Sequence, residues 1–305
     1  MKQFLKNISP FNNRLDMPSW MFVIKKFLAF WVCYIAGLLI AEGAAILLYF
    51  AMGKNLLVGN VFGNQADQLI QFYGYIIIIG VVLIYWKAVE KKPFAAMGLG
   101  KGFGSYIIGA LAGIFVLFLC VGAIVLTGSI EFKGIFQKID YTTILLFLGA
   151  YIIQGAMEEF LCRGMVLHAL KEKTSLAVAI AVSTVLFILP HWSSLFAGET
   201  IYGVLGAVNI ALVSVGFSLL VVRYRNIWAA CGFHSFWNAV IYSVLGLNLS
   251  GNEATAPAIF NMHSVGENIW NGGAFGIEAS AVTTVVLSVT AALLWVCNKK
   301  FPKKN

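Results

Sequence analysis

Ionisable and amide side chains are rare in this sequence, and several stand at helical spacing inside long apolar segments. They are Glu158, Glu159 and Arg163 in one segment, His191 in a second, and His234 with Asn238 in a third. Carboxylate, imidazole and amide groups together can activate water and stabilise a developing oxyanion. Glu158, His191 and His234 are also of the types that bind a catalytic zinc ion. An ionisable group at membrane depth costs at least ~2.5 kcal/mol and indicates a functional site.

The segment with two adjacent glutamates contains groups of different expected roles. Neighbouring residues on a helix point about 100° apart, so the two carboxylates cannot serve one face. Glu159 and Arg163 are four residues apart and are expected to pair. This pairing leaves Glu158 on another face, with no obvious partner on its own helix, as a candidate general base or metal ligand. The alternative is that all three side chains hold membrane helices together.

The two histidines lie in separate apolar segments. Pro190 removes a backbone hydrogen bond, so His191 is expected beside a local opening of its helix. His234 and Asn238 are four residues apart and project from one helix face. Hydrogen bonding between helices, without catalysis, is the alternative interpretation of both segments.

The composition indicates the solvent in which these residues act. Of the 305 residues, 60% are hydrophobic and 11% are charged, and the mean hydropathy is +0.86. Soluble domains have about 25% charged residues, so a cytosolic enzyme, a disordered protein and a nucleic-acid-binding domain are excluded. The five cysteines are odd in number and form no CxxC motif, which argues against a disulfide framework or a cysteine zinc site. We expect a lipid bilayer as partner, and neither nucleic acid nor nucleotide.

The apolar segments approach the ~20 residues needed to cross a bilayer. They are Phe27–Met52, Gln68–Trp86, Tyr106–Thr127, Tyr141–Leu170, Leu176–Phe196, Gly203–Val222, Asn226–Leu247 and Glu278–Cys297. The predicted fold is therefore all-α, a polytopic integral membrane bundle of about eight transmembrane helices. We expect a single transmembrane domain over 27–297, between a basic N-terminal segment, 1–26, and a basic tail, 298–305.

The basic residues are distributed unevenly between the two ends of the predicted helices. Seventeen lie in the N-terminal, C-terminal and alternate connecting segments, against three in the other loops. This bias predicts a multi-pass protein of the cell membrane with both termini in the cytoplasm. The short loops and basic ends are typical of a bacterial protein. The long loop 248–277 contains no Lys or Arg and is expected to cap the outer face.

Three motifs together resemble those of a known family. Glu158-Glu159-x-x-x-Arg163, Phe187-x-x-x-His191 and His234-x-x-x-Asn238 are similar in order and spacing to the motifs of the CPBP family. This family contains the CAAX proteases and bacteriocin-processing enzymes, relatives of the type II CAAX prenyl endopeptidase. Met97-Gly98-Leu99-Gly100 resembles a short stretch found upstream in these proteins. The resemblance covers roughly residues 90–245.

The resemblance implies an all-helical intramembrane endopeptidase with a cavity reached from the cytoplasmic side. Its substrate would be a membrane-anchored or lipidated protein, or a peptide precursor. Glu158 would activate water with His191, and His234 and Asn238 would bind the oxyanion. Glu159 and Arg163 would be structural. The family has been described both with a metal and with a metal-independent glutamate mechanism, and the sequence favours neither; Glu158, His191 and His234 would hold zinc if it is present.

Two other functions remain open at this stage. A non-catalytic bacteriocin self-immunity or membrane-binding protein could have the same motifs. A transporter or channel could use buried Glu and His as a proton relay, although paired broken helices in two halves of the chain are lacking. Glu42 lies outside the motifs, and it is expected to pair with Arg163, to line the substrate path or to serve packing alone.

Overall fold

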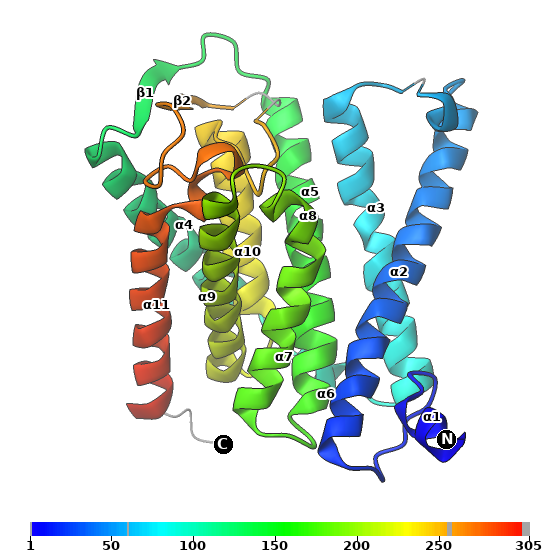
Figure 1. The fold of residues 1–305 in the computed structure, drawn as a ribbon. Helices are drawn as coiled ribbons and strands as arrows, with labels where there is room; N and C mark the ends of the chain where they lie inside the picture. Colours follow the sequence, from blue (N-terminus) through cyan, green and yellow to red (C-terminus); the bar gives the residue numbers. More distant parts are fainter. Residues whose placement is uncertain (1, 60, 255–257, 301–305) are drawn as a thin grey trace.

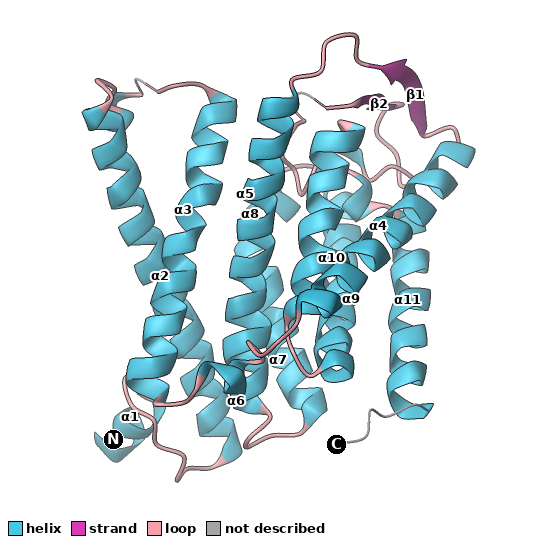
Figure 2. Ribbon diagram, turned by 180° about the vertical axis from the view of Figure 1, so that it is seen from behind, coloured by secondary structure: helices cyan, strands magenta, loops and turns pink. Residues whose placement is uncertain are grey.

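The chain forms a bundle of long helices with a small sheet at one end. The computed structural model describes residues 2–59, 61–254 and 258–300, so the tail predicted over 298–305 lies mostly outside the described residues. Helix α1 (Lys2–Ile8) and the last turn of α11 (Ala281–Lys300) lie at the same end of the bundle (Figures 1 and 2). We call this the terminal end. The antiparallel pair β1 (Ile130–Ile135) and β2 (Phe260–Ser264) marks the opposite, sheet end.

The helices follow the apolar segments of the sequence. The long ones are α2 (Ser19–Ala51), α3 (Asn64–Tyr85), α4 (Phe103–Leu126), α5 (Tyr141–Glu159), α7 (Leu176–Ile188), α9 (Thr200–Tyr224), α10 (Trp228–Ala239) and α11. The short ones are α6 (His168–Leu170) and α8 (Trp192–Leu195). Wide π turns extend three helices over Trp86–Glu90, Phe160–Leu167 and Val240–Leu245. Single 3-10 turns lie at Leu56–Val58, Phe94–Met97, Leu189–His191, Gly273–Phe275 and Ile277–Ala279.

Seven helices of the described chain are long and apolar enough to cross a membrane. They confirm the predicted all-α, polytopic helical bundle. The remaining predicted span, 226–247, forms α10 and the π turn that follows it. His234 and Asn238 lower the hydropathy of this segment, and nearly all of its side chains are buried among α4, α5 and α9. Neighbouring helices therefore cover the polar residues of α10.

Glycines let α10 approach its neighbours closely. A Cβ atom at Gly232 would lie 2.0 Å from the backbone oxygen of Tyr106 on α4, and one at Gly109 would lie 1.9 Å from that of Ala229. On the other side of α10, a Cβ atom at Gly155 of α5 would lie 2.9 Å from the Ser235 hydroxyl oxygen. Only glycine fits contacts this short, so these positions hold α10 against both α4 and α5.

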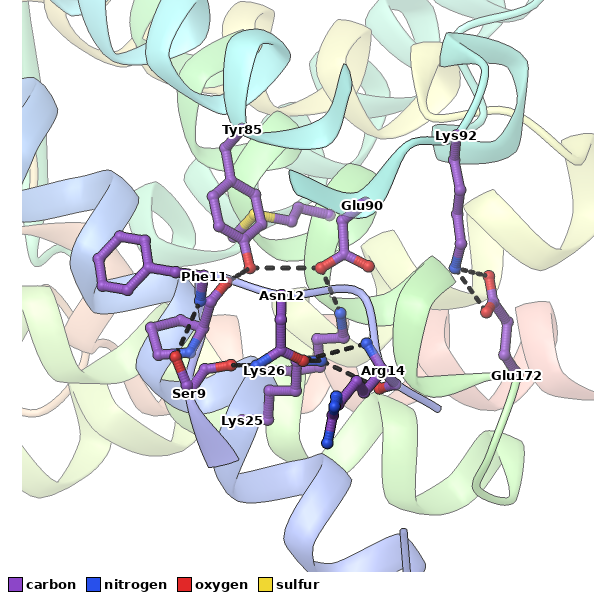
Figure 3. A network of polar contacts seen from close by, with 12 residues as sticks. Ser9, Phe11, Asn12, Arg14, Lys25, Lys26, Tyr85, Glu90, Lys92 and Glu172 are labelled. Carbon is purple, nitrogen blue, oxygen red and sulfur yellow. Dashed lines mark hydrogen bonds and ion pairs between the residues drawn. The ribbon is translucent and has the colours of Figure 1, made fainter. Parts of the chain in front are cut away.

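A buried polar network closes the terminal end near α2 and α3 (Figure 3). Lys26 Nζ lies 2.5 Å from Glu90 Oε1, and both side chains are 1% exposed. Lys25 Nζ donates to Asn12 Oδ1 at 2.9 Å. Because protein groups satisfy both lysines, α2 begins at Ser19, eight residues before the predicted start of the first span at Phe27. The helix therefore extends before the apolar segment that is predicted to cross the membrane.

Local capping fixes the starts of two helices that carry candidate site residues. The Asp140 carboxylate accepts from the backbone N–H of Thr143 at 3.1 Å and from its hydroxyl at 2.7 Å, at the start of α5. These hydrogen bonds hold the pKa of the Asp140 carboxyl below its usual value. Ser175 caps α7 by accepting from the Val178 N–H at 3.3 Å. Glu158 and His191 therefore lie on helices with defined starting points.

Candidate active site

The predicted site residues come together in the middle of the bundle. Glu158 and Glu159 end α5, Arg163 lies in the following π turn, His191 in the 3-10 turn after α7, and His234 and Asn238 on α10. A cavity of about 370 Å³ is lined by Glu158, His191, His234 and Asn238, together with residues of α2, α3 and α9. The three sequence motifs thus meet at one cavity.

Glu158 is held by a residue that sequence reasoning missed. Its Oε1 accepts from Gln154 Nε2 at 2.8 Å, and Gln154 Oε1 accepts from Asn238 Nδ2 at 2.9 Å. The expectation that Glu158 has no partner on its own helix is wrong, because Gln154 lies four residues before it on α5. Glu158 Oε2 makes no hydrogen bond among the described groups and lies 3.6 Å from His234 Nε2.

The second glutamate orients His234. His234 Nδ1 lies 3.2 Å from Glu159 Oε1. A carboxylate can only accept, so Nδ1 carries the hydrogen and Nε2 is left facing Glu158. The imidazole stacks on Phe217, with centroids 5.2 Å apart, and meets the edge of Phe187 at 5.7 Å. The ring is thus fixed by one hydrogen bond and two aromatic contacts.

The predicted pair of Glu159 and Arg163 forms, and both side chains have no exposed surface. Arg163 Nη1 lies 3.1 Å from Glu159 Oε1. Arg163 Nη2 donates to the Ser214 carbonyl at 2.9 Å and to its hydroxyl at 2.6 Å. The guanidinium also lies over the Phe187 ring, 4.5 Å from its centroid. Phe187 lines the cavity, so its ring lies between the cavity and the guanidinium of the ion pair.

His191 lies in the 3-10 turn Leu189–His191, directly after Pro190. Its Nδ1 lies 2.9 Å from the carbonyl oxygen of Phe187, the residue four positions earlier. A carbonyl only accepts, so Nδ1 donates and Nε2 of the neutral ring is free to accept. Among the described residues, no hydrogen bond joins His191 directly to Glu158 or His234. His191 shares the cavity with them and does not belong to their hydrogen-bonded chain.

The candidate zinc ligands do not form a ligand cluster. Within the described parts of the chain, no three side chains of His, Cys, Asp or Glu converge closely enough to hold a metal ion. Glu158, His191 and His234 line one cavity without this convergence. We therefore derive the chemistry of the site from the side chains alone.

Glu42 does not serve the site in either of the ways expected of it. Its side chain is exposed on α2, and the hydrogen bonds and ion pair of Arg163 go to Glu159 and Ser214. Glu42 is also not among the residues that line the cavity. The structure does show other polar residues that sequence reasoning left out, namely Gln154 and Ser214 beside the motifs and Glu278 in the cavity wall. Only Gln154 had a usable signal, its four-residue spacing from Glu158.

Comparison with known proteins supports the family expected from the motifs. Residues 140–240 match the model of a family described as "Type II CAAX prenyl endopeptidase Rce1-like". This segment contains every predicted site residue from Glu158 to Asn238, and the match confirms the resemblance to the CPBP family. No curated protein and no solved structure matches the chain. The family match supports a CAAX-type intramembrane protease as the general class.

Proposed function

We propose, from this family match and the cavity geometry, that the protein is an endopeptidase that hydrolyses a peptide bond with a water activated by Glu158. The observation that supports this most directly is the environment of Glu158. One oxygen is held by Gln154, and the other is buried without a hydrogen-bond partner among the described groups, 3.6 Å from His234 Nε2. The Glu158 side chain is 18% exposed and lines the cavity. A carboxylate that is held by a neighbouring amide and keeps unused acceptor capacity beside a cavity can act as a general base.

The reaction would proceed as follows. Water gives a proton to the Glu158 carboxylate, while its oxygen bonds to the carbonyl carbon of the substrate and forms a tetrahedral oxyanion. His191 Nε2 accepts a hydrogen bond from the same water. Collapse of the oxyanion breaks the carbon–nitrogen bond, and Glu158 returns its proton to the leaving amine.

The oxyanion would be stabilised from α10. Asn238 Nδ2 uses one of its hydrogens on Gln154, and the second is available for the oxyanion. A proton on His234 Nε2 would make a second donor, because Nδ1 already donates to Glu159. Glu159 would stabilise that imidazolium, as the carboxylate partner of a catalytic histidine does elsewhere.

The direct test is peptide cleavage by reconstituted protein carrying Glu158→Gln or, separately, His191→Ala. Loss of a general base lowers the rate by about 10²- to 10⁴-fold, and we expect a loss in this range for Glu158→Gln. Full activity of either variant would contradict the role given to that residue. A chelator is expected to leave the wild-type rate unchanged, whereas inactivation reversed by added zinc would show a metal mechanism.

The substrate can be identified by comparing the membrane proteomes of cells with the wild-type protein and cells with Glu158→Ala. Cells with Glu158→Ala are expected to accumulate an uncleaved membrane-anchored, lipidated or secreted precursor. If protection against a bacteriocin, or binding of a partner, survives Glu158→Gln unchanged, the non-catalytic self-immunity function replaces this proposal.

A further inference from the structure

The cavity runs from Glu158 toward the sheet end of the bundle. Its wall there includes Ser194 in α8, Asn252 in the loop after the last π turn of α10, and Glu278. These segments lie near the sheet end in Figure 1. Gln71, in the first half of α3, and Ser193 also line the cavity, and they are exposed like Asn252. The exposed part of the cavity wall is therefore on the side away from the termini.

Toward the terminal end the cavity is closed. Phe187 and Phe217 are buried in its wall, and the guanidinium of Arg163 lies over both rings. The side chains of Arg163 and Glu159 have no exposed surface. Ser214 belongs to the same layer, since its hydroxyl donates a hydrogen bond to the Thr184 hydroxyl on α7 at 2.9 Å. A substrate cannot reach Glu158 through this layer without breaking a buried ion pair.

The distribution of basic residues indicates which end of the bundle faces the cytoplasm, and therefore on which side of the membrane the closed layer lies. Among the residues that the structure describes, fifteen Lys and Arg lie at the terminal end and three at the sheet end, which assigns the terminal end to the cytoplasm. The mouth of the cavity then faces the outside of the cell. This differs from the cytoplasmic access that the family resemblance implied.

The formally charged residues of the cavity wall are acidic. Among the lining residues that the structure describes, Glu158 and Glu278 are acidic and none is Lys or Arg. Glu278 Oε2 accepts from the backbone N–H of Ser250 at 2.7 Å and from its hydroxyl at 2.6 Å, which fixes this carboxylate in the outer part of the wall. An acidic segment or a free C-terminal carboxylate would find no Lys or Arg in this wall, and the imidazolium proposed for His234 already has Glu159 as its partner.

We infer that the substrate enters from the extracytoplasmic face, and that it is an uncharged or cationic stretch within a longer chain. An exported peptide precursor, or the outer juxtamembrane segment of a membrane-anchored protein, fits this description. A cytoplasmic tail cut next to its C-terminal carboxylate does not. Cleavage itself rests on the proposed function, whereas the entry path is a property of the cavity.

Cysteine labelling tests the path without any need for a known substrate. Gln154→Cys places a thiol beside Glu158 in a Cys297→Ser background, where the four other cysteines are buried. The probes are two membrane-impermeant methanethiosulfonates, one carrying trimethylammonium and one carrying sulfonate. We expect labelling in intact spheroplasts and none in sealed inside-out vesicles. Labelling in the vesicles alone would overturn the inference, and so would equal labelling from both faces.

The charge of the probe tests the chemistry of the wall. Electrostatic focusing by like charges changes encounter rates by about tenfold or more, so the cationic probe should react faster than the anionic one by about this factor. Glu278→Gln should reduce this ratio, and an unchanged ratio would refute the substrate charge preference. Ser194→Cys serves as a second reporter if Gln154→Cys fails to fold. Among the described residues, the Ser194 hydroxyl donates to the backbone oxygen of His191 and to no other group, so little is lost with it.

Two controls separate this inference from the proposed function. Lys101→Cys, exposed in the loop before α4 at the terminal end, should label in inside-out vesicles only. The labelling pattern should persist when Glu158→Ala is added, since entry does not need catalysis. If Glu158→Ala keeps full peptidase activity while labelling stays outside, the proposed function fails and the path stands. If Glu158→Ala is inactive and labelling comes from inside, the path fails alone.

Discussion

Glu158 and Glu159 are adjacent in sequence but occupy opposite environments. The Glu159 side chain has no exposed surface, and its Oε1 is shared by Arg163 and His234. The Glu158 side chain is 18% exposed, although each of the two carboxylates has one buried oxygen without a hydrogen bond among the described groups. A carboxylate fixed by a cation serves to orient its neighbours, and a carboxylate open to a cavity can exchange protons with water. The division of roles follows from what each carboxylate touches.

Gln154 links Glu158 to Asn238, so its removal should act on the reaction more than on binding. Gln154→Leu keeps the side-chain volume and loses both hydrogen bonds. A hydrogen bond to a charged group is worth about 1.5–3 kcal/mol, so we expect kcat to fall by roughly 10- to 100-fold. KM should change little in a steady-state cleavage assay. Gln71→Leu, which removes another amide from the same cavity wall, is the matched control and should keep its kcat. If Gln154→Leu raised KM and left kcat unchanged, the positioning role of Gln154 would be contradicted.

Arg163 should matter first for stability. Arg163→Met leaves the Glu159 carboxylate buried without its cation, which costs about 3–5 kcal/mol. Denaturant unfolding in detergent measures this loss. The double variant Arg163→Met with Glu159→Leu should regain most of the lost stability, because no buried charge is then unpaired, but it should not regain cleavage, since His234 loses its acceptor. A double variant no more stable than Arg163→Met would refute the account.

Sequence spacing predicted part of this site. It predicted the pair of Glu159 and Arg163, because both partners lie on one helical segment. It also predicted a change of the helix beside His191, where the structure has the 3-10 turn that contains Pro190. It also placed His234 and Asn238 on one face, but they contact different residues, Glu159 and Gln154. Spacing along one helix does not show which residues of a neighbouring helix lie opposite. That depends on packing between helices.

At the scale of elements, the position of α10 depends on its glycine contacts. Gly232→Ala would place a Cβ atom 2.0 Å from the Tyr106 backbone oxygen, which cannot be relieved by turning a side chain. Overpacking of this kind costs about 1–3 kcal/mol or more, and the shift of α10 should move His234 away from Glu158. We therefore expect a lower unfolding midpoint and a reduced kcat. Gly122→Ala on α4 meets no atom within 4 Å and should be neutral or stabilising, so equal effects of both variants would contradict this.

The ion pair between α2 and the turn after α3 offers a second test. Glu90→Gln leaves Lys26 buried with no carboxylate, at an expected cost of about 3–5 kcal/mol. Figure 3 also shows Lys92 with Glu172, a pair whose side chains are 20% and 36% exposed. Glu172→Gln should cost at most about 1 kcal/mol, because water screens that pair. Unfolding in detergent compares the two variants; similar losses would show that burial is not what distinguishes them.

The same pair explains why one helix boundary could not be predicted. The first predicted span begins at Phe27, directly after Lys25 and Lys26. In the fold, Glu90 from a distant segment neutralises Lys26, and Asn12 accepts from Lys25. Hydrophobic runs predicted the existence and order of the spans, whereas contacts between distant segments decide where α2 begins.

The whole molecule has an apolar outer surface and two ends of different charge. Large exposed apolar side chains lie along the long helices, among them Leu39 and Leu47 on α2, Leu111 on α4 and Val285 on α11. In water such a surface would drive association, and in a bilayer it meets acyl chains. The fold therefore leaves only the two ends for contact with water. Which end faces the cytoplasm decides whether the cavity serves exported or cytoplasmic substrates.

Orientation can be measured with two thiols at opposite ends, independently of the cavity. In a Cys297→Ser background, Lys101→Cys reports on the terminal end and Glu131→Cys, exposed on β1, reports on the sheet end. The excess of basic residues at the terminal end predicts that an impermeant maleimide labels Glu131→Cys in intact spheroplasts, and Lys101→Cys only after permeabilisation. Detergent-solubilised protein, in which both thiols should react, shows that neither is hidden by the fold. The reverse pattern would place the cavity mouth in the cytoplasm, and the closed layer of Arg163, Phe187 and Phe217 would then separate Glu158 from the outside of the cell.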